Sequence, residues 1–183
     1  MLRRRSGARV IALLAGVFVL HAGMAHADAV AGCAGAAIPA VDESSRGRAA
    51  LAVLCLLNRE RTSRGLRAVR LSRELDSAAR FHSADMVQRR YFGHDGPRGD
   101  TLGTRVRRAG YAASHPRFGV GEALAWGRFV TPDLLVRALI HSARHRRILL
   151  DPRARDLGIG LTLGAPAVGV AQPSSTLVLD LGQ

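Results

Sequence analysis

Residues 72–94 read SRELDSAARFHSADMVQRRYFGH. Ser72 is a residue type favoured at a helix N-cap, and the basic residues Arg89 and Arg90 suit the C-terminal end of a helix. Between them, the side chains that repeat with the helical period are Leu75, Ala78, Ala79, His82 and Met86. The stretch therefore predicts an amphipathic helix with one face on a core, followed by a turn-rich loop that carries His94.

A second helix is expected before this stretch, from near Ser45 to Ser63. It is apolar on nearly every side between Leu51 and Leu57, which is typical of a buried helix. Gly65 stands where a helix C-cap is expected.

Two further helices are expected after the loop. The first covers Thr101–Ala109 and is stopped by Gly110, and residues 112–121 are predicted to be irregular. The second begins at Thr131-Pro132, an N-cap followed by proline at the first helical position, and is predicted to reach roughly Leu150.

The C-terminal part of the chain predicts strands. Residues 157–163 and 176–181 are apolar runs separated by a loop rich in Gly, Pro and Ser, the pattern of a hairpin. Helices followed by strands indicate an α+β domain with helices packed on a small antiparallel sheet.

Composition sets the limits of this interpretation. The chain has 183 residues with 48% hydrophobic and 22% charged residues, which suits one ordinary domain and excludes collagen-like, coiled-coil and disulfide-scaffold classes. The net charge is +13, and all 27 basic residues are arginine. The basic runs, such as 144–147, contain no interleaved aromatic residues, so we expect a solvated face and no specific nucleic acid.

The N-terminus predicts a secretory signal peptide over residues 1–27. An arginine-rich start is followed by an apolar run, Val10–Leu20, and by Ala25-His26-Ala27, which has small residues where a signal peptidase cleaves. An uncleaved membrane anchor is the alternative. Cleavage near Ala27 would place the protein outside the cell or in the envelope, with a charge of about +9 that attracts anionic polymers without specificity.

Export would also decide the state of the two cysteines. In an oxidising compartment, Cys33 and Cys55 can form one disulfide, and two unpaired cysteines are the alternative.

Several segments together resemble the CAP superfamily, also called the SCP domain, which includes cysteine-rich secretory proteins, venom antigens, pathogenesis-related proteins and many exported bacterial proteins. They occur in the family's order and are residues 56–61 with Gly65-Leu66, 78–86, 91–94, 105–111, 121–122 through 126–127, 145–146 through 149–152, and 158–160. The resemblance divides the chain into a signal peptide (1–27), a lead-in with Cys33 (28–46) and a CAP/SCP domain (47–183). It also implies the secreted bacterial branch, in which Cys33 and Cys55 would pair.

The resemblance implies a three-layer α-β-α sandwich and a central cleft. Family members gather two histidines and two acidic residues there. The histidines correspond to His94 and His145, and one acid corresponds to Glu122. The second acid falls near Arg105, so the set is incomplete and Arg105 would either point away or pair with Glu122. The chain also departs from the family pattern at four positions, where the resemblance implies asparagine, tryptophan, glycine and asparagine and this sequence has Ala123, Leu139, Arg144 and Ile148.

Two imidazoles and a carboxylate suffice for an open site for Zn²⁺ or another divalent cation, which needs three protein ligands and a water. His94, Glu122 and His145 are the predicted ligands, and a hydrogen-bonded polar cluster without metal is the alternative. His141 lies four residues before His145, but the segment lacks the glutamate of the metalloprotease motif, so we expect His141 to be a surface residue. His82 is expected to be a core histidine with its hydrogen bonds satisfied. Trp126 is expected to pack near the cleft floor.

The sequence supports three functional hypotheses. The first is a secreted, non-enzymatic binding module whose His/Glu cleft takes a divalent cation or a small lipid-like ligand, such as a lipid or sterol. The second is a hydrolase acting on extracellular peptide or cell-wall substrates, with Glu122 or a metal-bound water as the reacting group beside His94 and His145. The third is a basic envelope protein that adheres to anionic cell-wall polymer.

Overall fold

The first helix, α2 (Glu43–Thr62), starts at a well-formed cap. In the computed structural model, which describes residues 32–183, Asp42 accepts a hydrogen bond from the backbone N–H of Ser45 at 2.8 Å. The Ser45 hydroxyl in turn accepts from the Asp42 N–H, which completes a capping box. The helix therefore begins two residues before the predicted Ser45. A disulfide from Cys55 to Cys33 ties the preceding segment to this helix, which confirms the predicted pairing. The predicted signal peptide lies outside the described residues.

The next helices follow the predicted boundaries closely. Helix α3 (Arg73–Arg89) is capped by Ser72 and ends at Arg90, which takes the left-handed conformation with φ 59°. Helix α4 (Leu102–Arg108) is capped by Thr101. A single further turn, α5 (Tyr111–Ser114), follows Gly110, where the sequence predicted an irregular segment.

The last predicted helix is two helices. Helix α6 (Pro132–His141) begins at the predicted Thr131 cap, but Ser142 adopts an extended conformation with ψ 118° and separates it from α7 (Ala143–Leu149). The break changes the direction of the chain, so that α6 packs on α2 while α7 reaches β2.

The sheet has four strands in the order β1-β3-β4-β2. Strand β1 (Arg70–Leu71) pairs with β3 (Asp156–Leu163) in parallel, and β4 (Ser174–Gly182) pairs antiparallel with both β3 and β2 (Val120–Arg128). The β3–β4 hairpin was predicted. The prediction of an irregular approach to Glu122 was wrong, because residues 120–128 form an edge strand along the whole of β4.

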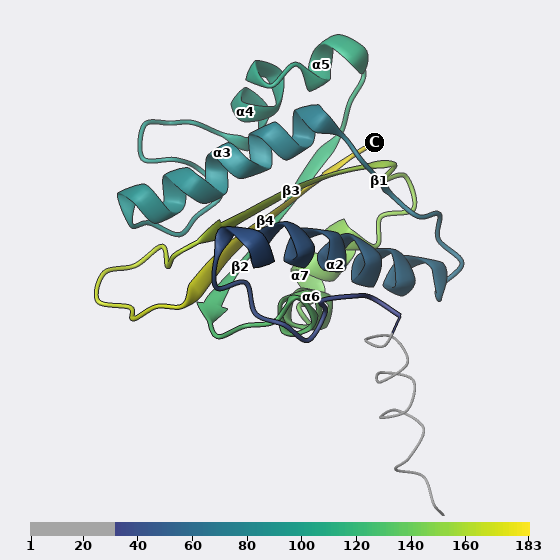
Figure 1. The fold of residues 1–183 in the computed structure, drawn as a ribbon. Helices are drawn as coiled ribbons and strands as arrows, with labels where there is room; N and C mark the ends of the chain where they lie inside the picture. Colours follow the sequence, from purple (N-terminus) through teal and green to yellow (C-terminus); the bar gives the residue numbers. More distant parts are fainter. Residues whose placement is uncertain (1–31) are drawn as a thin grey trace, which may run out of the picture.

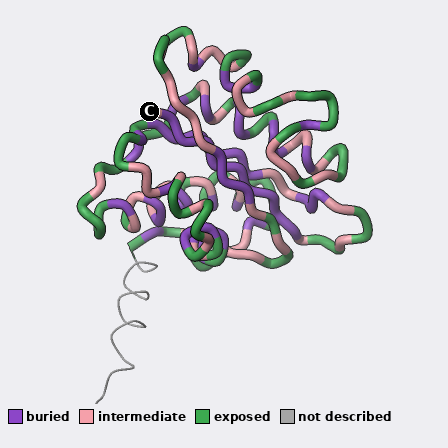
Figure 2. Tube along the Cα trace, turned by 180° about the vertical axis from the view of Figure 1, so that it is seen from behind, coloured by how far each residue is buried: buried purple, intermediate pink, exposed green. Residues whose placement is uncertain are grey.

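Helices cover both faces of this sheet, as the predicted three-layer sandwich requires. Helix α3, with α4 and α5 beyond it, covers one face, and α2, α6 and α7 cover the other (Figure 1). The strands form the buried centre of the fold, and β4 is buried at every residue (Figure 2). Helix α3 approaches β3 so closely that a Cβ on Gly160 would overlap the backbone carbonyl of Ala79.

A buried arginine fixes the segment after α7. Arg61 of α2 is fully buried and donates hydrogen bonds to the carbonyl oxygens of Leu149 (2.7 Å), Asp151 (3.1 Å) and Ala154 (3.3 Å). The Leu149 carbonyl lies at the C-terminal end of α7, where helix carbonyls lack intrahelical donors, and the Asp151 and Ala154 carbonyls follow it in the chain. Arg61 thereby holds α7, the helix that carries His145, against the rest of the domain.

Candidate functional site

Glu122 is the centre of a buried polar cluster beneath α3 and α4. It lies on β2, and its side chain is 2% exposed. Its Oε2 atom accepts a hydrogen bond from Arg105 Nη2 at 2.7 Å, and its Oε1 atom lies 2.6 Å from His94 Nδ1. Both carboxylate oxygens are thus engaged by cationic or cationisable groups of the protein itself.

Arg105 points into the cluster from α4. Its guanidinium group is fully buried and also donates to the carbonyl oxygens of Asp100 (2.7 Å) and His94 (3.0 Å). The Nε atom has no hydrogen-bond partner among residues 32–183. Of the two possibilities left open by the sequence, the structure shows the pairing of Arg105 with Glu122. The same side chain holds both ends of the 94–100 loop.

His94 lies at the boundary between this cluster and the solvent. Its side chain is 37% exposed, and its Nδ1 atom faces Glu122. A carboxylate at hydrogen-bond distance from one ring nitrogen fixes the orientation of the ring and favours the proton on that nitrogen. The Nε2 atom is therefore the nitrogen that His94 offers to a ligand.

His145 is the second imidazole near this surface. It lies on α7 and is partly buried. Burial lowers the pKa of His145, and the positive charges of His94 and Arg144 lower it further. No hydrogen bond between the imidazoles of His94 and His145 is found in the described part of the chain.

His82 supports the cluster from α3. It is 1% exposed, its Nε2 atom lies 2.9 Å from the Gly93 carbonyl oxygen, and the same atom lies 3.7 Å from Glu122 Oε2. The Tyr91 hydroxyl donates to Asp85 at 2.7 Å and lies 3.4 Å from His82 Nδ1. Burial is the main cause of a lowered pKa of His82. The expectation of a satisfied core histidine is confirmed.

Asp180 is a member of the cluster that the sequence interpretation missed. It is fully buried on β4, directly opposite Glu122 in the β2–β4 register, and neither of its carboxyl oxygens has a hydrogen-bond partner among residues 32–183. Burial raises the pKa of Asp180 well above its usual range, and the negative charge of Glu122 raises it further. The neutral acid is favoured, and in that form Asp180 can donate to Glu122. A lone aspartate inside the apolar run 176–181 was the available signal.

The comparisons with known proteins fit this geometry. The sequence profile of the cysteine-rich secretory protein family, CAP, matches residues 54–168. This chain belongs to the CAP family. The matched region contains His94, Arg105, Glu122 and His145, whereas Asp180 lies beyond it.

Three bacterial proteins are similar to this chain in sequence or structure. The chain is 31% identical over 108 residues to the uncharacterized protein YkwD of Bacillus subtilis, a match that spans 59% of this chain and 40% of YkwD. An extracellular SCP-domain protein of Bacillus anthracis superposes with a TM-score of 0.58 at 23% identity, covering 77% of this chain and 44% of that protein. An outer surface protein of Borrelia burgdorferi superposes with a TM-score of 0.59 at 17% identity, and the match covers 72% of this chain and 89% of that protein. These likenesses support the CAP fold.

Two departures from the CAP pattern lie in the core. Ala123 and Leu139, where the resemblance implied an asparagine and a tryptophan, are 0% and 2% exposed and pack in the core layer that includes α2 and α6. They add apolar contacts on the face of the sheet opposite Glu122. These two departures therefore do not bear on the geometry of the Glu122 cluster.

One of the three predicted metal ligands, Glu122, contacts Arg105 and His94 through its two oxygens. Within residues 32–183, no group of three or more His, Cys, Asp or Glu side chains that could hold a metal ion is found. The site formed by His94, Glu122 and His145 stays a prediction.

The remaining sequence candidates lie elsewhere. His141 is exposed, as expected. His115 stacks on Tyr111 with ring centroids 4.1 Å apart, and its Nε2 atom lies 3.4 Å from Asp156 Oδ2. Trp126 is 36% exposed and follows Glu122 by four residues along β2, towards the far end of the strand.

Proposed function

We propose that this CAP domain is a non-enzymatic binding module whose ligand contacts the imidazoles of His94 and His145. The observation that supports it most directly is the engagement of Glu122 by Arg105 at 2.7 Å and by His94 at 2.6 Å. A carboxylate held in this way positions its neighbours. In this proposal Glu122 orients His94 and does not itself react.

The exposed imidazole nitrogens define the ligand chemistry. A histidine whose other ring nitrogen is bonded to a carboxylate is the usual arrangement behind a metal ligand, with the carboxylate orienting the ring. The pair fits a divalent cation such as Zn²⁺, held by His94 Nε2 and His145 with its remaining positions filled by water or by a polar ligand group. The polar head of a small lipid-like molecule is the other ligand that two imidazoles can contact.

The location of the protein belongs to the same proposal. The predicted leader over residues 1–27 supports export, and the two similar solved structures are described as extracellular and outer surface proteins. No helix in residues 32–183 is both long enough and apolar enough to cross a membrane.

Calorimetric titration of Zn²⁺ into the purified, chelator-stripped chain without residues 1–27 tests the proposal. We expect saturable binding that disappears in His94→Ala/His145→Ala and persists in His141→Ala, a matched control that removes an exposed histidine from the preceding helix. If Zn²⁺ does not bind, the same three proteins are titrated with lysophosphatidylglycerol. Binding of neither probe, or equal binding by the double variant, contradicts the proposal.

A hydrolase is the second candidate, and the His94–Glu122 contact is the observation that favours it. An imidazole oriented by a carboxylate can act as a general base. Release of soluble fragments from casein or from purified cell wall by the unmodified protein, lost in His94→Ala and kept in His141→Ala, would establish turnover and exclude a binding-only role.

A further inference from the structure

One end of the sandwich combines exposed apolar side chains with uncompensated positive charge. We define the hairpin end as residues 87–92, 126–130 and 164–173, which are the end of α3, the end of β2 and the β3–β4 hairpin. These three segments lie together at the end of the molecule opposite the C-terminus (Figure 1). Arg128 Nε donates to the Ala171 carbonyl, and Val87 and Arg90 line the same cavity as Gly164 and the hairpin loop.

The apolar residues of the hairpin end are unusually exposed. Val168 at the hairpin tip is 70% exposed, Phe129 is 57% exposed, and Trp126 is 36% exposed. Phe129 has φ 50°, a left-handed conformation that is rare for a bulky residue. Its backbone N–H is bonded to the Pro173 carbonyl, so the hairpin holds the residue in this conformation with its ring in solvent.

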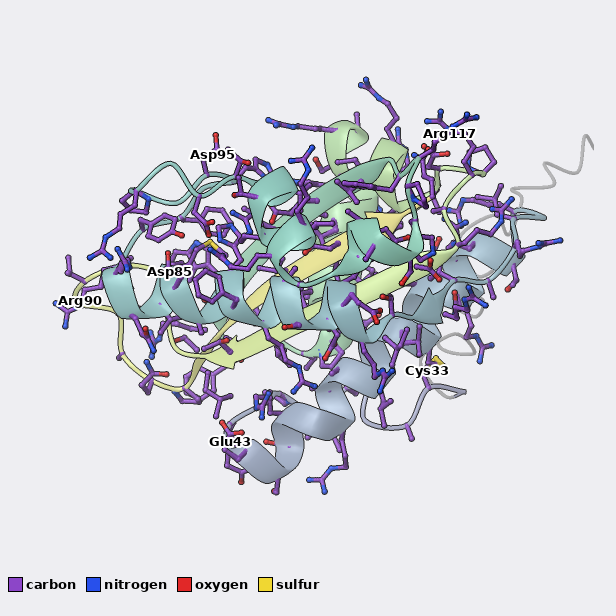
Figure 3. All side chains as sticks on the ribbon, turned by 90° about the horizontal axis from the view of Figure 1, so that it is seen from above. Cys33, Glu43, Asp85, Arg90, Asp95 and Arg117 are labelled. Carbon is purple, nitrogen blue, oxygen red and sulfur yellow. A yellow bond between two sulfur atoms is a disulfide. The ribbon has the colours of Figure 1, made fainter. Side chains whose placement is uncertain are left out.

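All charged side chains of the hairpin end are positive. Its three segments contain Arg89, Arg90 and Arg128 and no acidic residue. Arg89 is paired with Asp85, whereas no carboxylate of residues 32–183 forms an ion pair with Arg90 or Arg128. Arg128 lies over the Phe129 ring at 5.5 Å, and Arg90 projects from the end of α3 (Figure 3).

Aromatic rings and arginines on loop tips match the interface of an anionic bilayer. Tryptophan and other aromatic residues favour the headgroup region, apolar side chains reach the acyl boundary, and each arginine is attracted by anionic lipid. A soluble polyanion would use the arginines but would gain nothing from Phe129 and Val168. We infer that the hairpin end is a peripheral docking surface for an anionic lipid bilayer, with Phe129 and Val168 inserted and Arg90 and Arg128 contacting headgroups.

The single tryptophan of the chain provides the assay. The chain without residues 1–27 is mixed with vesicles of phosphatidylcholine alone or with phosphatidylglycerol, and Trp126 emission is recorded. We expect a blue shift with phosphatidylglycerol vesicles at low salt and quenching by brominated acyl chains. Absence of quenching overturns the proposal without any variant being needed.

Matched variants locate the surface. Phe129→Ser/Val168→Ser is expected to lower vesicle partitioning about tenfold or more, and Arg90→Gln/Arg128→Gln about fivefold per arginine. Leu71→Ser and Arg117→Gln, which change an exposed leucine and an exposed arginine away from the hairpin end, are expected to bind like the unmodified chain. Circular dichroism confirms that each variant is folded.

Two outcomes would contradict this surface. Unchanged binding by Phe129→Ser/Val168→Ser excludes insertion of the hairpin. Binding that added polyphosphate abolishes in the unmodified chain and in this variant alike identifies general attraction to polyanions. His94→Ala/His145→Ala should keep full vesicle binding, so failure of the cleft proposal and failure of this one are separate results.

Discussion

Replacing Arg105 by methionine removes the guanidinium group that three oxygen atoms share. Glu122 then keeps a negative charge that is buried beside Asp180, and the carbonyls of Asp100 and His94 lose a charged donor. Removing one partner of a buried ion pair costs about 3–5 kcal/mol, because the remaining charge is uncompensated. Set against a total stability of about 5–15 kcal/mol, this is a large loss.

Urea unfolding at neutral pH measures the effect. With a denaturant slope of about 2 kcal/mol/M, Arg105→Met is expected to lower the midpoint by about 2 M. Arg105→Met/Glu122→Gln has no buried unpaired charge. Its loss of unfolding free energy should therefore be smaller, by about 2 kcal/mol or more, than the sum of the losses in Arg105→Met and Glu122→Gln. Arg108 lies on the same helix as Arg105, and Arg108→Met, which breaks its partly exposed pair with Asp100, is the control and should lower the free energy of unfolding by less than about 1 kcal/mol. Equal losses for Arg105→Met and Arg108→Met, or additive effects of the Arg105 and Glu122 changes, would refute the reasoning.

Three further predictions concern individual positions. Hydrogen bonds from Ser45 lower the pKa of Asp42 from 3.8 to about 2. Asp42→Ala should therefore lower the melting temperature at neutral pH. Calorimetry should show this difference shrinking as the pH falls from 3.8 to about 2. The raised pKa of Asp180 has the opposite effect on stability. The stability contributed by Asp180 is fully present below the usual pKa of the carboxyl and is lost as the pH rises. Urea unfolding of Asp180→Asn should therefore depend less on pH above that usual pKa than unfolding of the unmodified chain, and a steeper dependence in the variant would count against a buried neutral acid. Gly160→Ala should lower the free energy of unfolding by about 1–3 kcal/mol, because the added Cβ overlaps the backbone of α3. Gly47→Ala, where the added Cβ meets open space on α2, should raise the free energy of unfolding by about 0.5–1 kcal/mol in the same assay.

The helices could be predicted because their ends are encoded locally. Ser72, Thr101 and Thr131 each accept a hydrogen bond from a backbone N–H three residues on, and such caps can be identified from residue type alone. The break at Ser142 has no local signal. It results from the different packing partners of α6 and α7, which only the tertiary structure supplies.

Strand β2 was missed because its sequence is poor in strand-forming residues. Residues 120–128 contain two glycines and two alanines, which β-propensity disfavours. The segment forms a strand because it pairs along the whole of β4. Propensity fails here because the partner strand lies far along the chain, with Arg128 paired to Ser174 and Val120 to Gly182.

The site could be predicted in part. His94, Glu122 and His145 came from the family resemblance, and the structure joins the first two directly. The role of Arg105 depends on the angle at which α4 meets the sheet, and that of Asp180 depends on strand register. Neither is encoded by spacing along the chain.

The position of β4 has a consequence for how the chain folds during synthesis. Strand β4, one of the two central strands of the sheet, is formed by residues 174–182, and three carbonyl partners of Arg61 belong to Leu149, Asp151 and Ala154. A growing chain that stops before residue 174 lacks β4 and has two separate strand edges, and one that stops before residue 149 also lacks three acceptors of Arg61. The domain therefore cannot assemble progressively from its N-terminus, and native structure is expected to form after translation of residues 174–182 in one cooperative step.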